Sequence, residues 1–248
     1  FNCGNLSSVT LPESLVSIGE SAFNSCTSLT SVVVSKNIKT IEPNTFRACS
    51  SLTNIVLPDS LVTIGESAFQ GCGMSQIRIP DNVSVFGSYA FKQCKSLTSV
   101  AIPKSMASIA RGAFDECSNL TSVTIPEGVT IIGSEAFQLC NLLSLSLPQS
   151  LTTITDGAGS YGAFANNKNL SVVVIPDNVM TVGGEAFAGC TSLKTIVFGA
   201  NVTTLGAGAL RGCTSLAEVS LPKKLTIIPH SCFVGCSALS KVILPEGL

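Results

Sequence analysis

The chain has 248 residues, of which 12% are charged and 45% hydrophobic, and its formal net charge is −1. There is no basic surplus to neutralise nucleic-acid phosphates, so nucleic-acid binding is disfavoured. No run of 18 or more apolar residues is present to span a bilayer, so no membrane insertion is expected within this segment.

Ten of the eleven cysteines recur at a nearly constant interval. The steps are 23 residues, except one of 22 between Cys72 and Cys94 and one of 50 between Cys140 and Cys190. Within the long step, Asn167 stands 23 residues before Cys190, where a further cysteine is due. Such a period predicts a single stack of repeated units over 1–248 rather than separate domains.

The unit that begins at Cys117 reads CSNLTSVTIPEGVTIIGSEAFQL. Its L-x-x-V-x-I pattern predicts a short strand with alternate side chains pointing inward, and Pro126 ends this strand because it has no N–H to donate. Glu127-Gly128 indicates a turn, and VTIIG predicts a second short extended segment. SEAFQL predicts a tight, partly helical corner whose Phe137 points into the interior.

One unit cannot bury its own apolar side chains, but stacked units form continuous columns of them. The expected fold is therefore a β-rich repeat solenoid of about eleven stacked 23-residue coils. It has a parallel sheet of short strands, a second row of short extended segments, and tight phenylalanine-containing corners. The expected corner column is Phe23, Phe46, Phe69, Phe91, Phe114, Phe137, Phe164, Phe187, Leu210 and Phe233.

The recurrence of I-P, I-G, A-F and C at fixed offsets closely resembles the BspA-like (Treponema pallidum-type) leucine-rich repeats, over essentially the whole chain. The unit lacks the regular Asn or Cys that follows the strand in common leucine-rich repeats, which favours short segments over a convex helix. We also expect the chain to be a segment of a longer protein, because it starts at Phe1 inside a corner and stops at Leu248 inside a unit.

The regular cysteines have three interpretations. Neighbouring units would place their Cα atoms near disulfide range. A metal ladder is disfavoured because the column has no C-x-x-C pair and the chain has a single histidine, His230. Free cysteine behaves as a small hydrophobe, and Asn167 could fill the same corner without joining a disulfide, so buried corner-filling thiols are favoured. Cys232 lies off the period, in the slot before Phe233 that is normally Ala, and is interpreted as core.

The stretch TDGAGSYGAF contains the spacing Gly157-x-Gly159-x-x-Gly162, the form of a dinucleotide-binding turn. The repeat aligns on both sides of it, so these glycines belong to a five-residue insertion in one corner, at about 155–162. No long helix is expected after it to face a pyrophosphate, so the nucleotide interpretation is rejected. The insertion is a plain surface loop or a contact loop, in which case Asp156, Ser160 and Tyr161 would touch a partner.

No other part of the sequence offers a convincing catalytic site. His230 could pair only with Cys232 or Cys236, and Cys232 is expected to point inward. We therefore expect no enzyme activity, no cofactor and no metal.

The strand positions between inward residues form two outward columns. One is mostly small and polar, and the other carries five β-branched aliphatic residues, which either reflects strand propensity or marks a surface that docks a protein. The candidate protein-binding residues on this face are Val33, Val56, Arg78, Thr124, Val174 and Val197.

The sequence by itself supports a repeat scaffold with a broad exposed sheet. The resemblance implies a protein-binding solenoid of a cell-surface or secreted protein, because BspA-like repeats are typical of surface proteins of host-associated bacteria and protists. Some of those proteins bind host matrix proteins or other cells, so a host matrix or cell-surface protein is the expected partner and adhesion the expected role. The alternative is a structural spacer without a ligand of its own.

Overall fold

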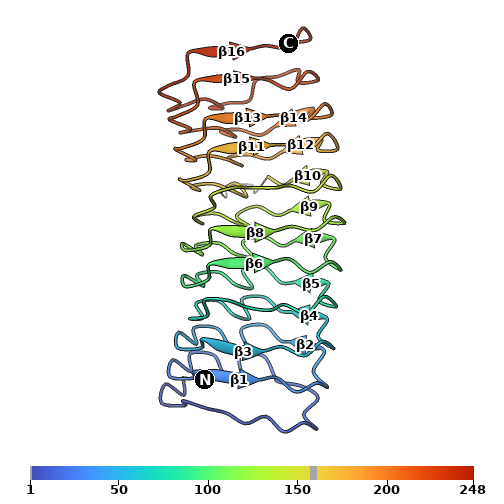
Figure 1. The fold of residues 1–248 in the computed structure, drawn as a ribbon, viewed down its shortest axis with the longest axis vertical. Coiled ribbons are helices and arrows are strands. Elements are labelled where there is room, and N and C mark those ends of the chain that lie inside the picture. The colour runs from blue at the N-terminus through green and yellow to red at the C-terminus, as the bar shows by residue number, and fades with distance from the viewer. Residues whose placement is uncertain (1, 157–160) are drawn as a thin grey trace.

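The computed structural model describes residues 2–156 and 161–248. The chain forms a parallel β-solenoid of about 23 residues per turn, and the described residues contain no helix (Figure 1). One side of the coil, called the main face below, carries three-residue strands. They are β1 (Ser31–Val33), β3 (Asn54–Val56), β6 (Ser99–Ala101), β8 (Ser122–Thr124), β11 (Val172–Val174), β13 (Thr195–Val197), β15 (Glu218–Ser220) and β16 (Lys241–Ile243).

A second row of two-residue strands follows the turn after each main-face segment. It comprises β2 (Thr40–Ile41), β4 (Thr63–Ile64), β5 (Val85–Phe86), β7 (Ser108–Ile109), β9 (Ile131–Ile132), β10 (Thr153–Ile154), β12 (Thr181–Val182) and β14 (Thr204–Leu205). These strands form a three-stranded sheet, β2-β4-β5, and a five-stranded sheet, β7-β9-β10-β12-β14. The expected second row of extended segments is confirmed.

The main face is divided rather than continuous. Its eight strands pair in parallel as four two-stranded sheets, β1–β3, β6–β8, β11–β13 and β15–β16. Each pair keeps the register of the repeat, so that Val33 lies opposite Val56 and Val174 opposite Val197. The strand direction and register agree with the sequence, whereas the single broad sheet that it suggested is interrupted.

Two of the interruptions coincide with shortened units. Most units place the proline slot nine residues after the cysteine, as in Cys117 to Pro126, but Pro80 follows Cys72 and Pro148 follows Cys140 after only eight. In the described chain, these two units carry no main-face strand. The missing residue falls just before the strand, so the backbone cannot reach the register of its neighbours.

The solenoid has about nine turns, slightly fewer than the eleven expected from the sequence. Backbone pairing on the main face is found in nine units of the described chain, namely the eight strands and an isolated bridge between Ser8 and Ser31. The two shortened units carry the second-row strands β5 and β10 but no main-face strand among the described residues.

The corners contain turns instead of the partly helical segment that was expected. Two residues of most corners have positive φ, for example Glu135 (59°) and Leu139 (53°), and this alternation of backbone handedness prevents a helix. The corner N–H groups alternate accordingly between two acceptors. Phe137 N donates to Ala163 O of the next unit at 2.8 Å, whereas Gln138 N donates to Glu135 O of its own turn at 3.1 Å. The corners thus add a third ladder between units.

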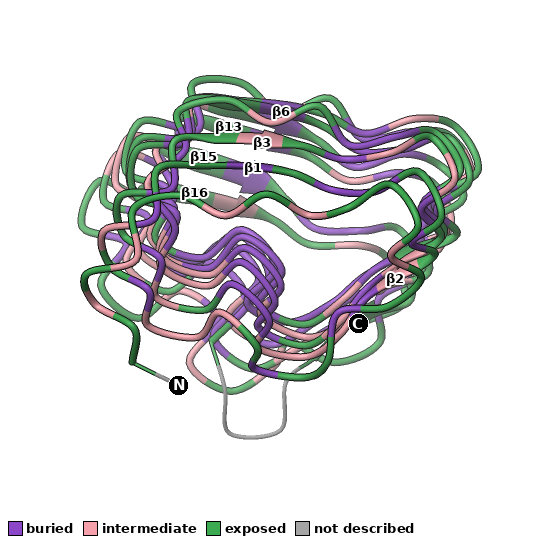
Figure 2. Cartoon of the chain, turned by 90° about the horizontal axis from the view of Figure 1, so that it is seen from below, coloured by how far each residue is buried: buried purple, intermediate pink, exposed green. Residues whose placement is uncertain are grey.

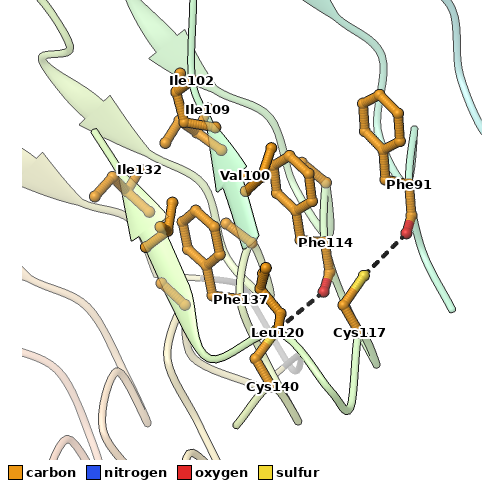
Figure 3. Close-up of a cluster of buried hydrophobic side chains, with 14 of the residues drawn as sticks. Phe91, Val100, Ile102, Ile109, Phe114, Cys117, Leu120, Ile132, Phe137 and Cys140 are labelled. Atoms are coloured by element: carbon orange, nitrogen blue, oxygen red, sulfur yellow. Dashed lines mark hydrogen bonds between the residues drawn. The ribbon is translucent and has the colours of Figure 1, made fainter. Parts of the chain in front are cut away.

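The phenylalanine column occupies the centre of the core, as predicted. The seven rings from Phe46 to Phe187 are fully buried, and successive rings from Phe23 onward stack with centroids 5.3–5.6 Å apart. Figure 2 shows buried residues lining the inside of the coil and exposed ones on its outside. The stacked rings of Phe91, Phe114 and Phe137 are visible in Figure 3.

The cysteine column lies beside the rings. Nine of the ten periodic cysteines are buried, Cys3 is exposed, and Cys232 is buried as expected of a core residue. The eleven cysteines are free thiols. Each buried cysteine of the column from Cys49 onward directly follows a corner. Its Sγ donates to the carbonyl of the column residue in the corner one coil earlier, as Cys117 does to Phe91 O at 3.1 Å and Cys140 to Phe114 O at 3.2 Å (Figure 3). The thiol is thus both a small apolar filler and a hydrogen-bond donor.

Asn167 performs the same task with an amide. Its Nδ2 donates to Phe137 O at 2.8 Å and to Phe164 O at 2.9 Å, while its Oδ1 accepts the backbone N–H of Leu142 at 3.1 Å. Leu142 belongs to the second shortened unit, so the side chain of Asn167 also accepts a hydrogen bond from a backbone N–H there. A thiol would be a poorer partner for this N–H, because its sulfur is only a weak acceptor.

Candidate functional site

The candidate valines of the main face are exposed. The exposed fractions are 65% for Val33, 51% for Val56, 55% for Val174 and 51% for Val197. Their strands alternate between outward and buried positions, so these side chains point away from the core. The outward column inferred from the sequence is therefore the solvent-facing surface of the main face.

The four valines form two separate pairs. Val33 and Val56, the N-terminal valine pair, lie side by side in the first two-stranded sheet. Val174 and Val197, the C-terminal valine pair, lie side by side in the third. Between the two pairs is the β6–β8 sheet, where the small and polar side chains of Ala101 and Thr124 occupy the same column. The strand pairs β1–β3 and β11–β13, which carry these valines, are separated along the rod (Figure 1), and Ile243 in β16 is a further exposed aliphatic residue of the same column.

Arg78 belongs to the first shortened unit and is exposed. Its Nη1 donates to Asp59 Oδ1 at 2.9 Å, across a turn of the neighbouring unit. A groove of about 510 Å³ opens around this unit between β3 and β6, and Arg78 is part of its lining. The exposed Thr124 lies in β8 outside this groove, so the structure does not bring these two candidates together.

The insertion candidates belong to a different part of the coil. Asp156 and Tyr161 are exposed and flank the insertion after β10, a strand of the second row and not of the main face. Ser160, like Gly157 and Gly159, lies outside the described residues. Gly162 is buried, and a Cβ at this position would overlap the carbonyl group of Glu185. This glycine thus permits close stacking of two corners, and no helix follows it among the described residues.

The cysteine and histidine candidates lack the environment of a nucleophile. Burial raises the pKa of the Cys232 thiol to about 11, so the reactive thiolate is disfavoured. His230 is exposed while Cys232 is buried, which places the two side chains in different surroundings. Within the described ranges, no three His, Cys, Asp or Glu residues gather as a metal site would require. No helix there is long and apolar enough to cross a membrane.

A charged cluster at the corners is a feature that the sequence analysis missed. Lys92 Nζ lies 2.8 Å from Asp115 Oδ2 and 3.3 Å from Glu116 Oε1. Tyr89 donates its hydroxyl to Glu135 Oε2 at 2.9 Å, with Lys92 above its ring. Burial raises the pKa of the Asp115 carboxyl, and its Oδ1 has no hydrogen-bond partner among the described atoms. The 23-residue spacing of Lys92 and Asp115 was the available signal, since such residues stack in adjacent units.

Taken together, these residues define a non-helical repeat solenoid with an exposed strand face. The family model for the BspA-type leucine-rich repeat region matches residues 1–98, 84–161 and 159–248. The chain therefore belongs to the BspA-type leucine-rich repeat family, as its sequence pattern indicated.

Solved structures of leucine-rich repeat proteins share this fold. A leucine-rich repeat protein from Bacteroides ovatus is 24% identical, with a TM-score of 0.53, over 98% of this chain and 82% of that one. A leucine-rich cell surface protein from Faecalibacterium prausnitzii is 27% identical, with a TM-score of 0.58, over 90% of this chain and 62% of its own. A leucine-rich repeat protein from Eubacterium ventriosum is 23% identical, with a TM-score of 0.58, over 88% of this chain and 60% of that one. The chain thus spans less than two thirds of the latter two. Comparison with the curated proteins finds no match.

Proposed function

We propose that this chain is a non-enzymatic protein-binding solenoid of a cell-surface or secreted protein, and that it binds its partner through the main face. Its role is adhesion or partner recognition, with a host matrix or cell-surface protein as the partner. Membership of the leucine-rich repeat family supports a protein-interaction scaffold. The similarity to a leucine-rich cell surface protein supports the location.

The observation that carries the proposal is the outward placement of the two valine pairs. All four side chains are at least half exposed, and each pair forms a continuous apolar strip across two strands. Exposed apolar groups that are gathered in this way favour association, because burying them against a partner removes them from water. Strand propensity alone would not require valine at these four positions, since threonine and alanine occupy the same column in β6 and β8.

The experiment is capture of purified extracellular-matrix and cell-surface proteins by the immobilised solenoid. Two double variants, Val33→Glu with Val56→Glu and Val174→Glu with Val197→Glu, place charge on one valine pair at a time. We expect capture to be lost in at least one of them, with an unfolding free energy within about 0.5 kcal/mol of wild type per substitution, because outward positions make few buried contacts.

The matched control is Val62→Glu with Val85→Glu, which adds the same charge at two exposed valines away from the main face. This variant should capture as wild type does. If all three variants capture equally well, the main face is not the binding surface. If wild-type protein captures nothing from the panel, the proposal fails and a structural spacer without its own ligand becomes the better description.

A further inference from the structure

The unit that carries β13 departs from the repeat at one inward position. The slot after each main-face strand holds an aliphatic residue in the other units, namely Leu11, Val34, Leu57, Ile79, Ile102, Ile125, Leu147, Ile175, Leu221 and Leu244. In this unit the slot holds Phe198, and Gly199 replaces the usual proline. Phe198 is only partly buried against the core, whereas Ile175 in the preceding unit is almost completely buried. The larger ring does not fit fully into a slot built for an aliphatic side chain.

The third interruption of the main face lies next to this residue. Neither β13 nor β15 belongs to a shortened unit, yet they are not paired and belong to separate sheets. A groove of about 650 Å³ lies between them, lined by Ile196, Val197, Phe198 and Val219 together with the turns that follow the strands. Some Cα atoms of the two strands are within 8 Å of each other. A whole strand inserted between them would need about 9.6 Å, so the groove admits side chains rather than a strand.

The charges at the groove favour an anionic partner. Both carboxylates of the lining are engaged, because Asp177 accepts the backbone N–H of Ala200 at 2.8 Å and Glu218 pairs with Lys241 at 2.8 Å. Lys194 precedes β13, and Lys223 follows β15 at the other end of the groove. Both lysines are exposed, and neither forms an ion pair within the described part of the chain.

We propose that this groove binds an extended, acidic peptide segment of a protein partner. One apolar side chain of the peptide enters the groove against Phe198, and a carboxylate on each side of it meets Lys194 or Lys223. In repeat register, Lys223 corresponds to Ala200, so the two lysines are six residue steps apart, roughly 20 Å of extended chain at most. The proposal rests on the proposed function and narrows it to one site and one chemical class of partner.

The probe is an acetylated, amidated and fluorescently labelled heptapeptide with aspartate at both ends, leucine at the centre and serine elsewhere. Fluorescence anisotropy at low salt would measure its dissociation constant against the solenoid of residues 1–248. We expect it to bind at least about tenfold more tightly than two control peptides, one with lysine at both ends and one with serine at the centre. Its binding should weaken at 0.5 M salt, because exposed charges are then screened.

Two variants test the site itself. Lys194→Glu with Lys223→Glu should reduce affinity for the acidic peptide at least about tenfold and improve binding of the lysine-ended one. The charge-matched control, Lys104→Glu with Lys168→Glu, should leave both unchanged. Phe198→Ile installs the usual residue, so it should let β13 pair with β15, slow amide hydrogen exchange in both strands, and reduce peptide binding.

The groove proposal is overturned if the acidic peptide binds no better than the control peptides. It is also overturned if Phe198→Ile slows exchange while leaving the affinity intact. Either result leaves the proposed function standing, provided that the immobilised solenoid captures a protein and loses it on substitution of a valine pair. Failure of capture together with tight peptide binding would instead reject the proposed partner while supporting the groove.

Discussion

Truncation of Phe137 to alanine tests the central column of the core. The ring is fully buried and stacks on Phe114 and Phe164, with centroids 5.5 Å away on each side. Buried Phe→Ala substitutions cost about 3–5 kcal/mol of unfolding free energy. The neighbours cannot collapse into the space, because the corner ladder holds the backbone, with Phe137 N donating to Ala163 O at 2.8 Å. Two ring contacts are also lost, so we expect the upper end, about 4–5 kcal/mol.

Urea unfolding followed by circular dichroism measures this loss. The control is Phe233→Ala, because Phe233 is only partly buried and its column neighbour is Leu210 rather than another ring. We expect about 2 kcal/mol there. Both curves need a nearest-neighbour description of repeats, since solenoids depart from two-state behaviour. If Phe137→Ala costs no more unfolding free energy than Phe233→Ala, the idea that the stacked, fully buried rings stabilise one another is refuted.

Three further predictions concern the polar groups of the core. Asn167→Cys should lose about 1–3 kcal/mol of unfolding free energy, because the N–H of Leu142 loses its acceptor; an unchanged urea midpoint would contradict this role. Burial raises the thiol pKa of Cys49 and Cys94 from 9.0 to about 12. The contribution of these protonated thiols to the unfolding free energy is therefore complete below pH 9. As the pH rises toward 12, the unfolding free energy falls by up to about 1.4 kcal/mol per pH unit for each thiol. Unfolding at pH 7.5 and 10 measures this loss, and Cys94→Ala should reduce it; an identical slope in that variant would contradict the assignment. Lys92→Met should cost about 3 kcal/mol at pH 7 by leaving Asp115 buried without its cation. Burial already raises the Asp115 pKa, so the deficit should shrink on acidification as the carboxyl is protonated. The control is Lys241→Met, which removes the exposed ion pair between Lys241 and Glu218. It should lower the unfolding free energy by less than about 1 kcal/mol, without this pH dependence.

Much of the candidate site was accessible from the sequence because outward positions follow from strand periodicity. Val33, Val56, Val174 and Val197 are exposed as their alternation with buried residues required. Their division into two pairs was not anticipated, because it depends on which strands form. The signal was present in the spacing of eight residues between Cys72 and Pro80, where nine is usual. The step of 22 residues from Cys72 to Cys94 shows the same missing residue, whereas in the unit of Cys140 the insertion hides it and only the distance to Pro148 reveals it.

The sequence by itself determined the repeat, the parallel register and the identity of the core columns. In a solenoid, stacking makes residues 23 positions apart equivalent, so one period places Phe114 beside Phe137 without any further information. The tertiary structure alone decided where neighbouring strands pair and how the corners run. The strands β13 and β15 are unpaired beside the partly buried ring of Phe198, although neither belongs to a shortened unit. The corner depends on bonds from each N–H to the next unit, which favour alternating backbone handedness over the helix that local sequence suggested. Both are properties of the contact between units, and a pattern within one unit does not contain them.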